Sequence, residues 1–187
     1  PPDASAPPTS LLQYLTTIGK QGQHGERFAY KTINTDVLAW IIRRTSGRAF
    51  AELLSERIWQ PLGAEEDADI TVDRLGIEFA GGGLNTTLRD LARFGEMMRN
   101  RGRFNGRQIV PAAVVDDIAR GGDPAKFPTE TYPTIPGWSY RNQWWVSHDA
   151  HSVYMARGIH GQSIWVDPKC EVVIARYASH QIGRAHV

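Results

Sequence analysis

Three short stretches of the chain hold residues that could do chemistry. The first is RFAYKTINTD (27–36), in which Tyr30 ends an extended, aromatic run just before an expected helix. The second is the glycine run GGGLN (81–85), and the third is the turn GIHGQ (158–162). A tyrosine hydroxyl can transfer protons, and glycine-rich turns bring backbone N–H groups close to a ligand or an oxyanion. None of the three is specific alone, because Tyr30 also fits a half-buried aromatic residue at a strand end.

Other catalytic signatures are missing from the sequence. It contains no phosphate-binding loop, no dinucleotide fingerprint, no cysteine pair, no helical His-Glu-x-x-His and no Gly-x-Ser-x-Gly. His148 and His151 in HDAH have a metal-like spacing, but only Asp149 is near enough to complete a site. Cys170 lies in a surface-type turn with no base expected beside it. We therefore expect no metal and no cofactor, and we do not expect Cys170 to act as a nucleophile.

Composition narrows the class of protein and its partners. The 187 residues are 41% hydrophobic and 22% charged, which fits a globular chain with its own core. Lysine and arginine total 21 against 20 acidic residues, without blocks of like charge, so we expect no nucleic-acid partner. A single cysteine excludes an internal disulfide. No apolar stretch approaches the ~18 residues that span a bilayer, and the sequence does not distinguish a cytoplasmic from a periplasmic location or indicate an oligomeric state.

The elements that must position these stretches follow from periodicity and turn residues. Apolar spacing predicts helices at 11–20, 34–47, 48–63 and 111–122, and another that Thr87 caps and that ends before Gly102. The wide apolar face of VLAWII (37–42) predicts that its helix is well buried, and Pro61 is expected to end the third helix. In the helix after Thr87 we expect a core stripe of four residues: Leu88, Leu91, Phe94 and Met98.

The C-terminal part of the chain changes to strand patterns. Segments rich in aromatic and β-branched residues predict antiparallel strands at 141–147, 152–159, 162–168 and 171–178, after a long loop at 122–138. Trp144 and Trp145 should point to opposite faces of their strand. The fold class is therefore α+β, with helices first and an antiparallel meander last. Asn105-Gly106 predicts a tight turn.

In this order and spacing the motifs resemble the serine β-lactamase-like, penicillin-recognising superfamily, and most closely its 6-aminohexanoate-dimer hydrolase branch. The resemblance runs from about Leu12 to Ser179, and it is carried by FAYKTINTDVLAW, AGGGLNTTLRDLARFGEMM and GIHGQSIWVDP. It implies a β-lactamase/transpeptidase-like fold, an antiparallel sheet flanked by helices. It also implies a serine hydrolase that cleaves small-molecule linear amides or carboxylic esters through an acyl-enzyme.

The resemblance assigns a role to the first stretch. Tyr30 matches the tyrosine of the second motif, which acts as general base for the serine and proton donor to the leaving group. The motif is usually Tyr-x-Asn, but Thr32 stands at the third position here and Asn34 follows two residues later. Either Thr32 or Asn34 therefore inherits the polar contact to substrate. A free tyrosine titrates near 10, so a phenolate base near neutrality needs a pKa lowered by about three units, or about 4 kcal/mol.

The resemblance also assigns the other two stretches. Ile159, His160 and Gly161 occupy the place of the third motif, Lys-Thr-Gly in penicillin-recognising members, and their backbone N–H groups would stabilise an oxyanion. Because the lysine is absent, amide or ester substrates are favoured over β-lactam carboxylates. Asn85 and Trp145 match positions that line the substrate pocket.

The family nucleophile, a Ser-x-x-Lys, does not occur in the sequence. Thr17 and Lys20 have its spacing, but they lie at an expected helix end and are interpreted as structural. Because the family motif lies upstream of the tyrosine, we expect residues 11–181 to be the C-terminal portion of one β-lactamase-like domain, inactive alone. We expect 1–10 to be linker-like and IGRAHV (182–187) to be a non-native tail. Alternatives are a β-lactamase or D-alanyl carboxypeptidase-like enzyme, or a catalytically inert binding domain of this fold.

Overall fold

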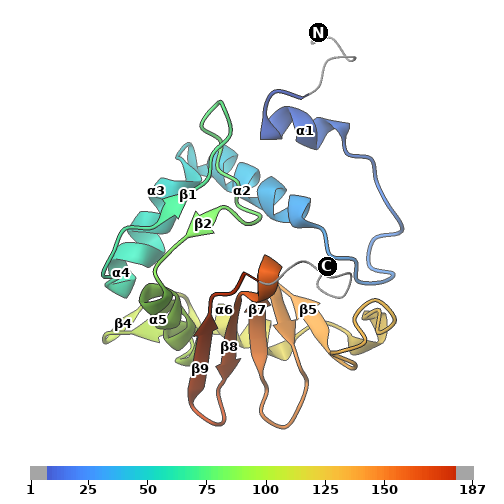
Figure 1. Cartoon of the computed structure of the whole chain (residues 1–187), viewed down its shortest axis with the longest axis vertical. Coiled ribbons are helices and arrows are strands. Elements are labelled where there is room, and N and C mark those ends of the chain that lie inside the picture. The colour runs from blue at the N-terminus through green and yellow to red at the C-terminus, as the bar shows by residue number, and fades with distance from the viewer. Residues whose placement is uncertain (1–7, 180–187) are drawn as a thin grey trace.

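The computed structural model describes residues 8–179, and it combines helices with one main antiparallel sheet. In Figure 1 helices α1 to α4 lie together on one side of the molecule, while α5 and α6 lie against the sheet. The α+β prediction is confirmed. The linker-like assignment of 1–10 falls largely outside the described residues, and the assignment of 182–187 falls wholly outside them. No helix within 8–179 is long and apolar enough to cross a bilayer.

All five predicted helices are present, with shifted ends. Gly19 follows the first, Gly47 caps the second in the left-handed conformation, and Pro111 precedes the last. The third is a continuous run in which a π-helical turn, η1, joins two α-helical pieces. Their bounds are α1 Leu11–Thr17, α2 Thr32–Ser46, α3 Phe50–Leu54, η1 Ser55–Trp59, α4 Gln60–Leu62, α5 Leu88–Arg99 and α6 Ala112–Arg120.

The sequence predicted that Pro61 ends the third helix, and this was wrong. The π turn explains why the helix continues through Pro61. Pro61 has no N–H to donate and disrupts a regular helix interior. In η1 the Gln60 N–H reaches back five residues to the Ser55 carbonyl, and the chain stays helical through Pro61. The helix ends instead at Gly63, which has a φ of 66°.

The apolar face of α2 is exposed, which contradicts the prediction that this helix is well buried. Leu38 is 50% exposed, and Ile41 and Ile42 are also exposed, whereas only Asp36 and Ala39 are buried. The run 37–42 is apolar on almost every side of the helix. Helix α1 and the segment at 77–78 approach only the side that holds Ala39, so the described part of the chain leaves the rest of the apolar surface in water.

Helix α5 begins as the sequence predicted but packs through a different stripe. The Thr87 hydroxyl accepts the Asp90 N–H at 3.1 Å and caps the helix. Leu91 and Phe94 pack against the core as expected, and Met98 is buried. Leu88 is 45% exposed, so its assignment to the core was wrong. Its place is taken by Met97, because the core touches the later turns of the helix and not the first residue.

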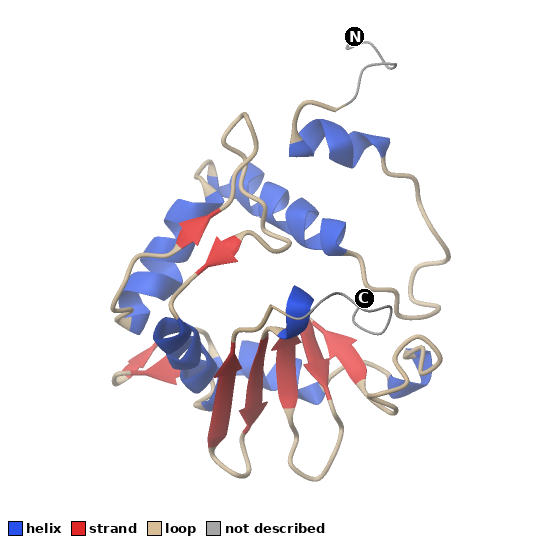
Figure 2. Cartoon of the chain, viewed as in Figure 1, coloured by secondary structure: helices blue, strands red, loops and turns tan. Residues whose placement is uncertain are grey.

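The main sheet is an antiparallel meander in the order β5-β6-β7-β8-β9, as Figure 2 shows. The predicted strand at 141–147 proved to be two strands, because Asn142 and Gln143 both have positive φ and form a tight two-residue turn. The sheet thus gains a strand, β5, which begins two residues before the predicted strand. The bounds are β5 Ser139–Arg141, β6 Trp144–Val146, β7 Tyr154–Arg157, β8 Ser163–Asp167 and β9 Val172–Arg176.

Two short strand pairs accompany the sheet. The first pair was not predicted, and it joins β1 Asp69–Ile70 to β2 Leu84–Asn85. The second is a hairpin between β3 Arg103–Phe104 and β4 Arg107–Gln108. Its turn residues Asn105 and Gly106 have positive φ, which confirms the predicted tight turn.

Each face of the sheet buries its own apolar cluster. Trp144 belongs to the cluster that α5 and α6 cover, whereas Trp145 belongs to an aromatic cluster on the other face. The predicted alternation of the two tryptophans is confirmed. Both rings are buried, so the sheet is covered on both sides near β6.

Asp90 is a fully buried carboxylate that connects α5 to the segment before β1. It accepts N–H groups of Glu65 and Glu66 at 2.9 and 3.2 Å, the Thr87 hydroxyl at 2.8 Å, and Arg93 at 2.8 Å. Burial acts to raise the pKa of Asp90, but these donors together hold it below its ordinary value. The ionised form is therefore the one that the fold stabilises.

We expect Asp90→Ala to lower the free energy of unfolding by about 3 kcal/mol, because it leaves buried donors without a partner. Urea unfolding at pH 7 measures the loss. Since the folded-state pKa is depressed, the stabilisation is present above the unfolded pKa near 4 and is lost as the pH falls through the folded value. The difference between wild type and variant should therefore shrink in acid. Asp116→Ala, at an exposed ion pair with Arg101, is the control and should change little.

Candidate active site

Tyr30 lies at the junction between the helical half and the sheet. It follows Phe28, whose N–H donates to the Lys126 carbonyl at 2.9 Å, and it precedes the first residue of α2. Its ring stacks on Trp145 with centroids 6.0 Å apart and meets Tyr140 edge-on at 5.8 Å. Tyr30 is 40% exposed. The structure thus brings together two of the predicted site residues, Tyr30 and Trp145, and leaves the tyrosine accessible.

The Tyr30 ring is at the edge of an aromatic cluster around Trp145. Burial raises the pKa of Tyr140, and its neighbours Tyr30 and Tyr132 raise it further. Burial also raises the pKa of Tyr132, although the Arg157 guanidinium acts in the opposite direction. Arg157 lies over the Trp145 ring at 5.3 Å. Both partly buried phenols therefore stay protonated near neutral pH.

A hydrogen-bonded bridge holds the start of α2 against the sheet. The side-chain oxygen of Gln143 accepts the Tyr140 hydroxyl and the Thr35 hydroxyl, each at 3.0 Å. Gln143 lies in the tight turn that joins β5 to β6, directly before the first residue of β6. The bridge was not predicted, because it depends on the turn that the sequence pattern did not show.

Thr32 and Asn34 lie in the first turn of α2, close behind Tyr30. The helix begins at Thr32, two residues before the predicted start. Both side chains are exposed, and the Asn34 N–H donates to the Lys31 carbonyl. Lys31 itself contacts Gln21. Because residues two apart on a helix do not share a face, the Thr32 and Asn34 side chains point in different directions.

The glycine run meets α2 at a buried carboxylate. The Gly81 N–H donates to Asp36 at 2.9 Å, and a Cβ added to Gly81 would lie 2.5 Å from the Thr32 methyl group. Burial raises the pKa of Asp36, against the lowering effect of the Gly81 and Ala80 N–H groups. The sequence interpretation missed Asp36. Its signal was a single acidic residue inside the apolar helix pattern directly after Tyr30.

Asn85 is less closely connected to Tyr30 than the sequence motifs implied. It lies in β2, opposite Asp69, and its side-chain amide donates to the Gly83 carbonyl at 3.0 Å. Among the contacts that the described residues make, none joins Asn85 to Tyr30. If Asn85 lines a substrate pocket, it does so as the last residue of the glycine run and not through a contact with Tyr30.

The third-motif segment forms a short helical turn, η3 Ile159–Gly161, between β7 and β8. The sequence predicted that this glycine-rich turn offers backbone N–H groups to an oxyanion, and for Gly158 this was wrong. The Gly158 N–H donates to the Gln162 carbonyl at 2.9 Å. His160 has a φ of 65°, which turns the chain sharply, and Ile159 is exposed. Because β7 ends beside the start of β6, η3 lies at the same end of the sheet as the Gln143 turn (Figure 2).

The spacing of Thr17 and Lys20 has no catalytic geometry. The Thr17 hydroxyl donates to the Tyr14 carbonyl at 2.8 Å, and the Lys20 ammonium reaches Gln23 at 3.4 Å. A groove of about 530 Å³ lies nearby, between α1 and the segment 71–79. None of the predicted site residues lines this groove. The groove is therefore separate from the candidate active site around Tyr30.

The two histidines of HDAH point to different partners. His148 bonds the Ser139 hydroxyl at 2.7 Å, and the Asp149 carboxylate accepts the His151 N–H within the turn. His151 lies 3.3 Å from the Cys170 sulfur, so the expectation that no base stands beside Cys170 was wrong. Partial desolvation and then the Asp167 carboxylate raise the pKa of the Cys170 thiol. A raised pKa is unfavourable for a nucleophilic thiolate.

Comparisons with known proteins identify the family of the chain. A family model described as Beta-lactamase matches residues 1–186. The chain is 40% identical over 173 residues to a 6-aminohexanoate-dimer hydrolase of Paenarthrobacter ureafaciens, an alignment that covers 92% of this chain and 44% of that protein.

Solved structures show the same fold. A Bacillus anthracis protein, provisionally assigned as a 6-aminohexanoate-dimer hydrolase, superposes with a TM-score of 0.84 at 36% identity, over 96% of this chain and 46% of its own. A β-lactamase from Mycobacterium bovis superposes with a TM-score of 0.65 at 21% identity, over 88% of this chain and 61% of its own. The predicted β-lactamase/transpeptidase-like fold is confirmed, and the chain spans about half the length of the first two relatives.

Gly81→Ala should destabilise the junction between the glycine run and α2, because its methyl group would overlap Thr32 and crowd Asp36. We expect a loss of about 1–3 kcal/mol in the free energy of unfolding, measured in urea. Gly82→Ala is the matched control, because its Cβ would make only an ordinary contact with Phe79 at 3.5 Å. Equal losses in the two variants would contradict the assigned packing.

Asp36→Asn should stabilise the protein at pH 7, because asparagine keeps an oxygen for the Gly81 N–H and removes the buried charge. The folded-state pKa is raised, so wild-type stability is highest below the unfolded pKa near 4 and falls as the pH rises through the folded value. Thermal unfolding from pH 3 to 8 should show the variant's advantage growing with pH.

Asp73→Asn is the control for this pH dependence. The Ile77 N–H is the main cause that lowers the pKa of Asp73, so the variant should lose stability at pH 7 and recover relative to wild type in acid. A difference between Asp36→Asn and wild type that does not vary with pH would refute the role of the buried charge.

Proposed function

The chain belongs to the β-lactamase family, and from this premise we propose that it supplies the proton-transfer part of a hydrolase for linear amides, of the 6-aminohexanoate-dimer type, or carboxylic esters. The observation that carries the proposal is the position of Tyr30. Its accessible ring stacks on Trp145 at the end of the sheet that also holds η3. Two relatives with that hydrolase name, at 40% and 36% identity, support the substrate class.

In the proposed reaction the nucleophile is a serine from a Ser-x-x-Lys outside this chain, and residues 11–181 form the C-terminal portion of the domain. The serine oxygen attacks the substrate carbonyl while its proton moves to the Tyr30 phenolate. Backbone N–H groups near Ile159 stabilise the oxyanion of the tetrahedral intermediate. As the intermediate collapses, Tyr30 returns the proton to the leaving amine or alcohol. Water then hydrolyses the acyl-enzyme by the same route.

The proposed substrate contacts surround Tyr30. Thr32 or Asn34, both exposed in the first turn of α2, would hydrogen-bond the substrate. Trp145 would contribute an apolar wall, since it already packs flat against the Tyr30 ring. Asn85 would approach from the glycine run. His160 stands where the penicillin-recognising members have a threonine after lysine, and the missing lysine favours substrates without a carboxylate at that position.

We expect Tyr30→Phe to lower kcat at least ~100-fold in the complete gene product, because it removes the proton carrier and keeps the ring that packs on Trp145. Hydrolysis of the linear 6-aminohexanoate dimer and of a p-nitrophenyl ester measures the effect. Tyr14→Phe, on the exposed surface of α1, is the matched control and should retain full activity. The 187-residue chain alone should give no turnover.

Three outcomes would contradict the proposal. Turnover that is unaffected by Tyr30→Phe would exclude the tyrosine as the proton carrier. Cleavage of a β-lactam in preference to both substrates would favour a β-lactamase. Binding of the amide dimer by the complete protein without any turnover would favour a catalytically inert binding domain.

A further inference from the structure

A second cluster of chemically active side chains lies at the other end of the sheet. His151 belongs to the turn between β6 and β7, Asp167 ends β8, and Cys170 lies in the turn between β8 and β9. Strand β7 runs from this end to η3, and β8 returns from η3 to this end. The cluster is therefore about 15 Å from η3 along the strands, separate from Tyr30 and from the proposed reaction.

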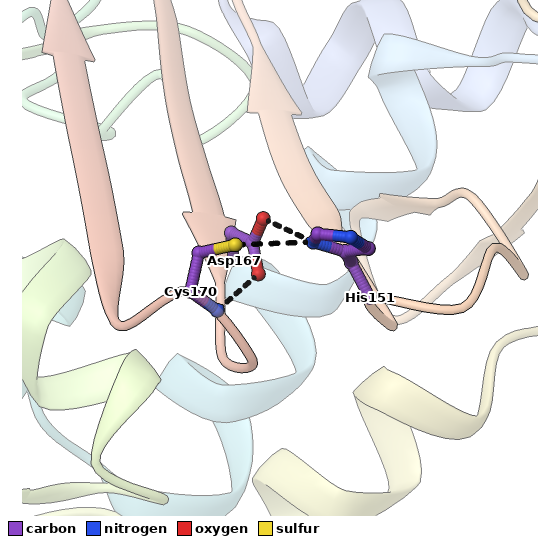
Figure 3. Close-up of side chains that lie close together, drawn as sticks. All are labelled: His151, Asp167 and Cys170. Carbon is purple, nitrogen blue, oxygen red and sulfur yellow. Dashed lines mark hydrogen bonds and ion pairs between the residues drawn. The ribbon is translucent and has the colours of Figure 1, made fainter.

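The three side chains converge on one point, as Figure 3 shows. The Nδ1 atom of His151 lies 2.9 Å from Asp167 Oδ2 and 3.3 Å from the Cys170 sulfur. Among the described residues, these form the group of potential metal ligands, with all three ligand atoms within 4.8 Å of one another. Tetrahedral zinc with ordinary bond lengths separates such atoms by about 3.4–3.6 Å. The two distances from His151 Nδ1 would lengthen by about 0.2–0.5 Å to reach these separations.

The surrounding hydrogen bonds already orient these ligands. The Cys170 N–H donates to Asp167 Oδ1 at 2.8 Å, which directs the other carboxylate oxygen toward His151. The Asp149 carboxylate holds the His151 backbone at 2.9 Å. The Lys169 ammonium reaches the Ala150 carbonyl at 3.4 Å and joins the two turns. Partners of this kind fix ligand orientation in metal sites.

We propose that His151, Asp167 and Cys170 form a binding site for a zinc-like divalent cation, which joins the β6–β7 turn to the β8–β9 turn. Thiolate and imidazole together select a borderline-soft ion over magnesium or calcium. The three protein ligands leave a fourth position for water. Because the ligands come from different turns, the bound ion ties together two hairpins that are otherwise joined here only through the sheet and short polar contacts.

The ligand chemistry provides a direct readout. Cobalt(II) replaces zinc in such sites and gives a near-ultraviolet absorption band only when it is bonded to a thiolate. Titration of the metal-free, reduced chain with cobalt chloride should give this band, with saturation at one ion per chain. Zinc chloride should abolish the band by competition. Zinc should also raise the melting temperature, because it binds the folded state.

Three variants localise the site. Cys170→Ser should abolish the band, and His151→Ala should weaken cobalt binding at least ~10-fold. His148→Ala is the matched control, because it alters a histidine of the same HDAH turn that bonds Ser139 instead. It should bind cobalt as wild type does. If His151→Ala fails to fold by circular dichroism, Cys170→Ser carries the test, since it replaces an exposed side chain.

Two results would overturn the proposal. One is the absence of a thiolate band in the wild-type chain at millimolar cobalt. The other is a zinc-dependent rise in melting temperature that is equal in wild type and Cys170→Ser, which would place the ion elsewhere. Neither result bears on Tyr30, so the metal site and the proposed hydrolase activity stand or fall separately.

Discussion

The packing of Tyr30 on Trp145 is the contact on which the arrangement of the site depends. It joins the start of α2 to the second strand of the sheet, and it is reinforced by Tyr140 and by the Gln143 bridge to Thr35. An aromatic stack fixes a ring in position and plane while leaving its hydroxyl free. The same stack places Tyr30 beside the strand ends that carry Arg157 and η3. Phe28, two residues earlier, adds its own ring contacts with Tyr140 and Trp145, with centroids 4.7 and 5.7 Å apart.

A second constraint acts from the opposite side of α2. The Asp36 carboxylate accepts the Gly81 N–H, and the absence of a side chain at Gly81 lets the backbone approach Thr32. A buried carboxylate with a raised pKa costs stability near neutral pH. In exchange, the hydrogen bond orients the glycine run in front of the helix that follows Tyr30. The exposed apolar residues of the same helix, Leu38, Ile41 and Ile42, show that this part of the chain buries only one side of α2.

Local patterns predicted the elements well, and contacts distant in sequence were predicted poorly. Thr87 signals the start of α5 and Asn105-Gly106 signals a turn, since each acts through its own neighbours. The strand break at Asn142 was missed because neither turn residue is glycine. Burial of α2 was overestimated because the periodicity shows which residues are apolar. It does not show whether another element of the chain packs against them. The meeting of His151 with Cys170 depends on sheet register, which the sequence pattern does not reveal.

For the site, the family motifs predicted roles for Tyr30 and Trp145, and the structure brings these two residues together. Asp36, Gln143 and Arg157 were missed because their partners come from other elements. The central claim, that Tyr30 transfers the proton during acylation, is tested most directly by the pre-steady-state burst of p-nitrophenol from an ester mixed with the complete protein. A stoichiometric burst that slows at least ~100-fold in Tyr30→Phe is the predicted result. A burst of unchanged rate in Tyr30→Phe would contradict it.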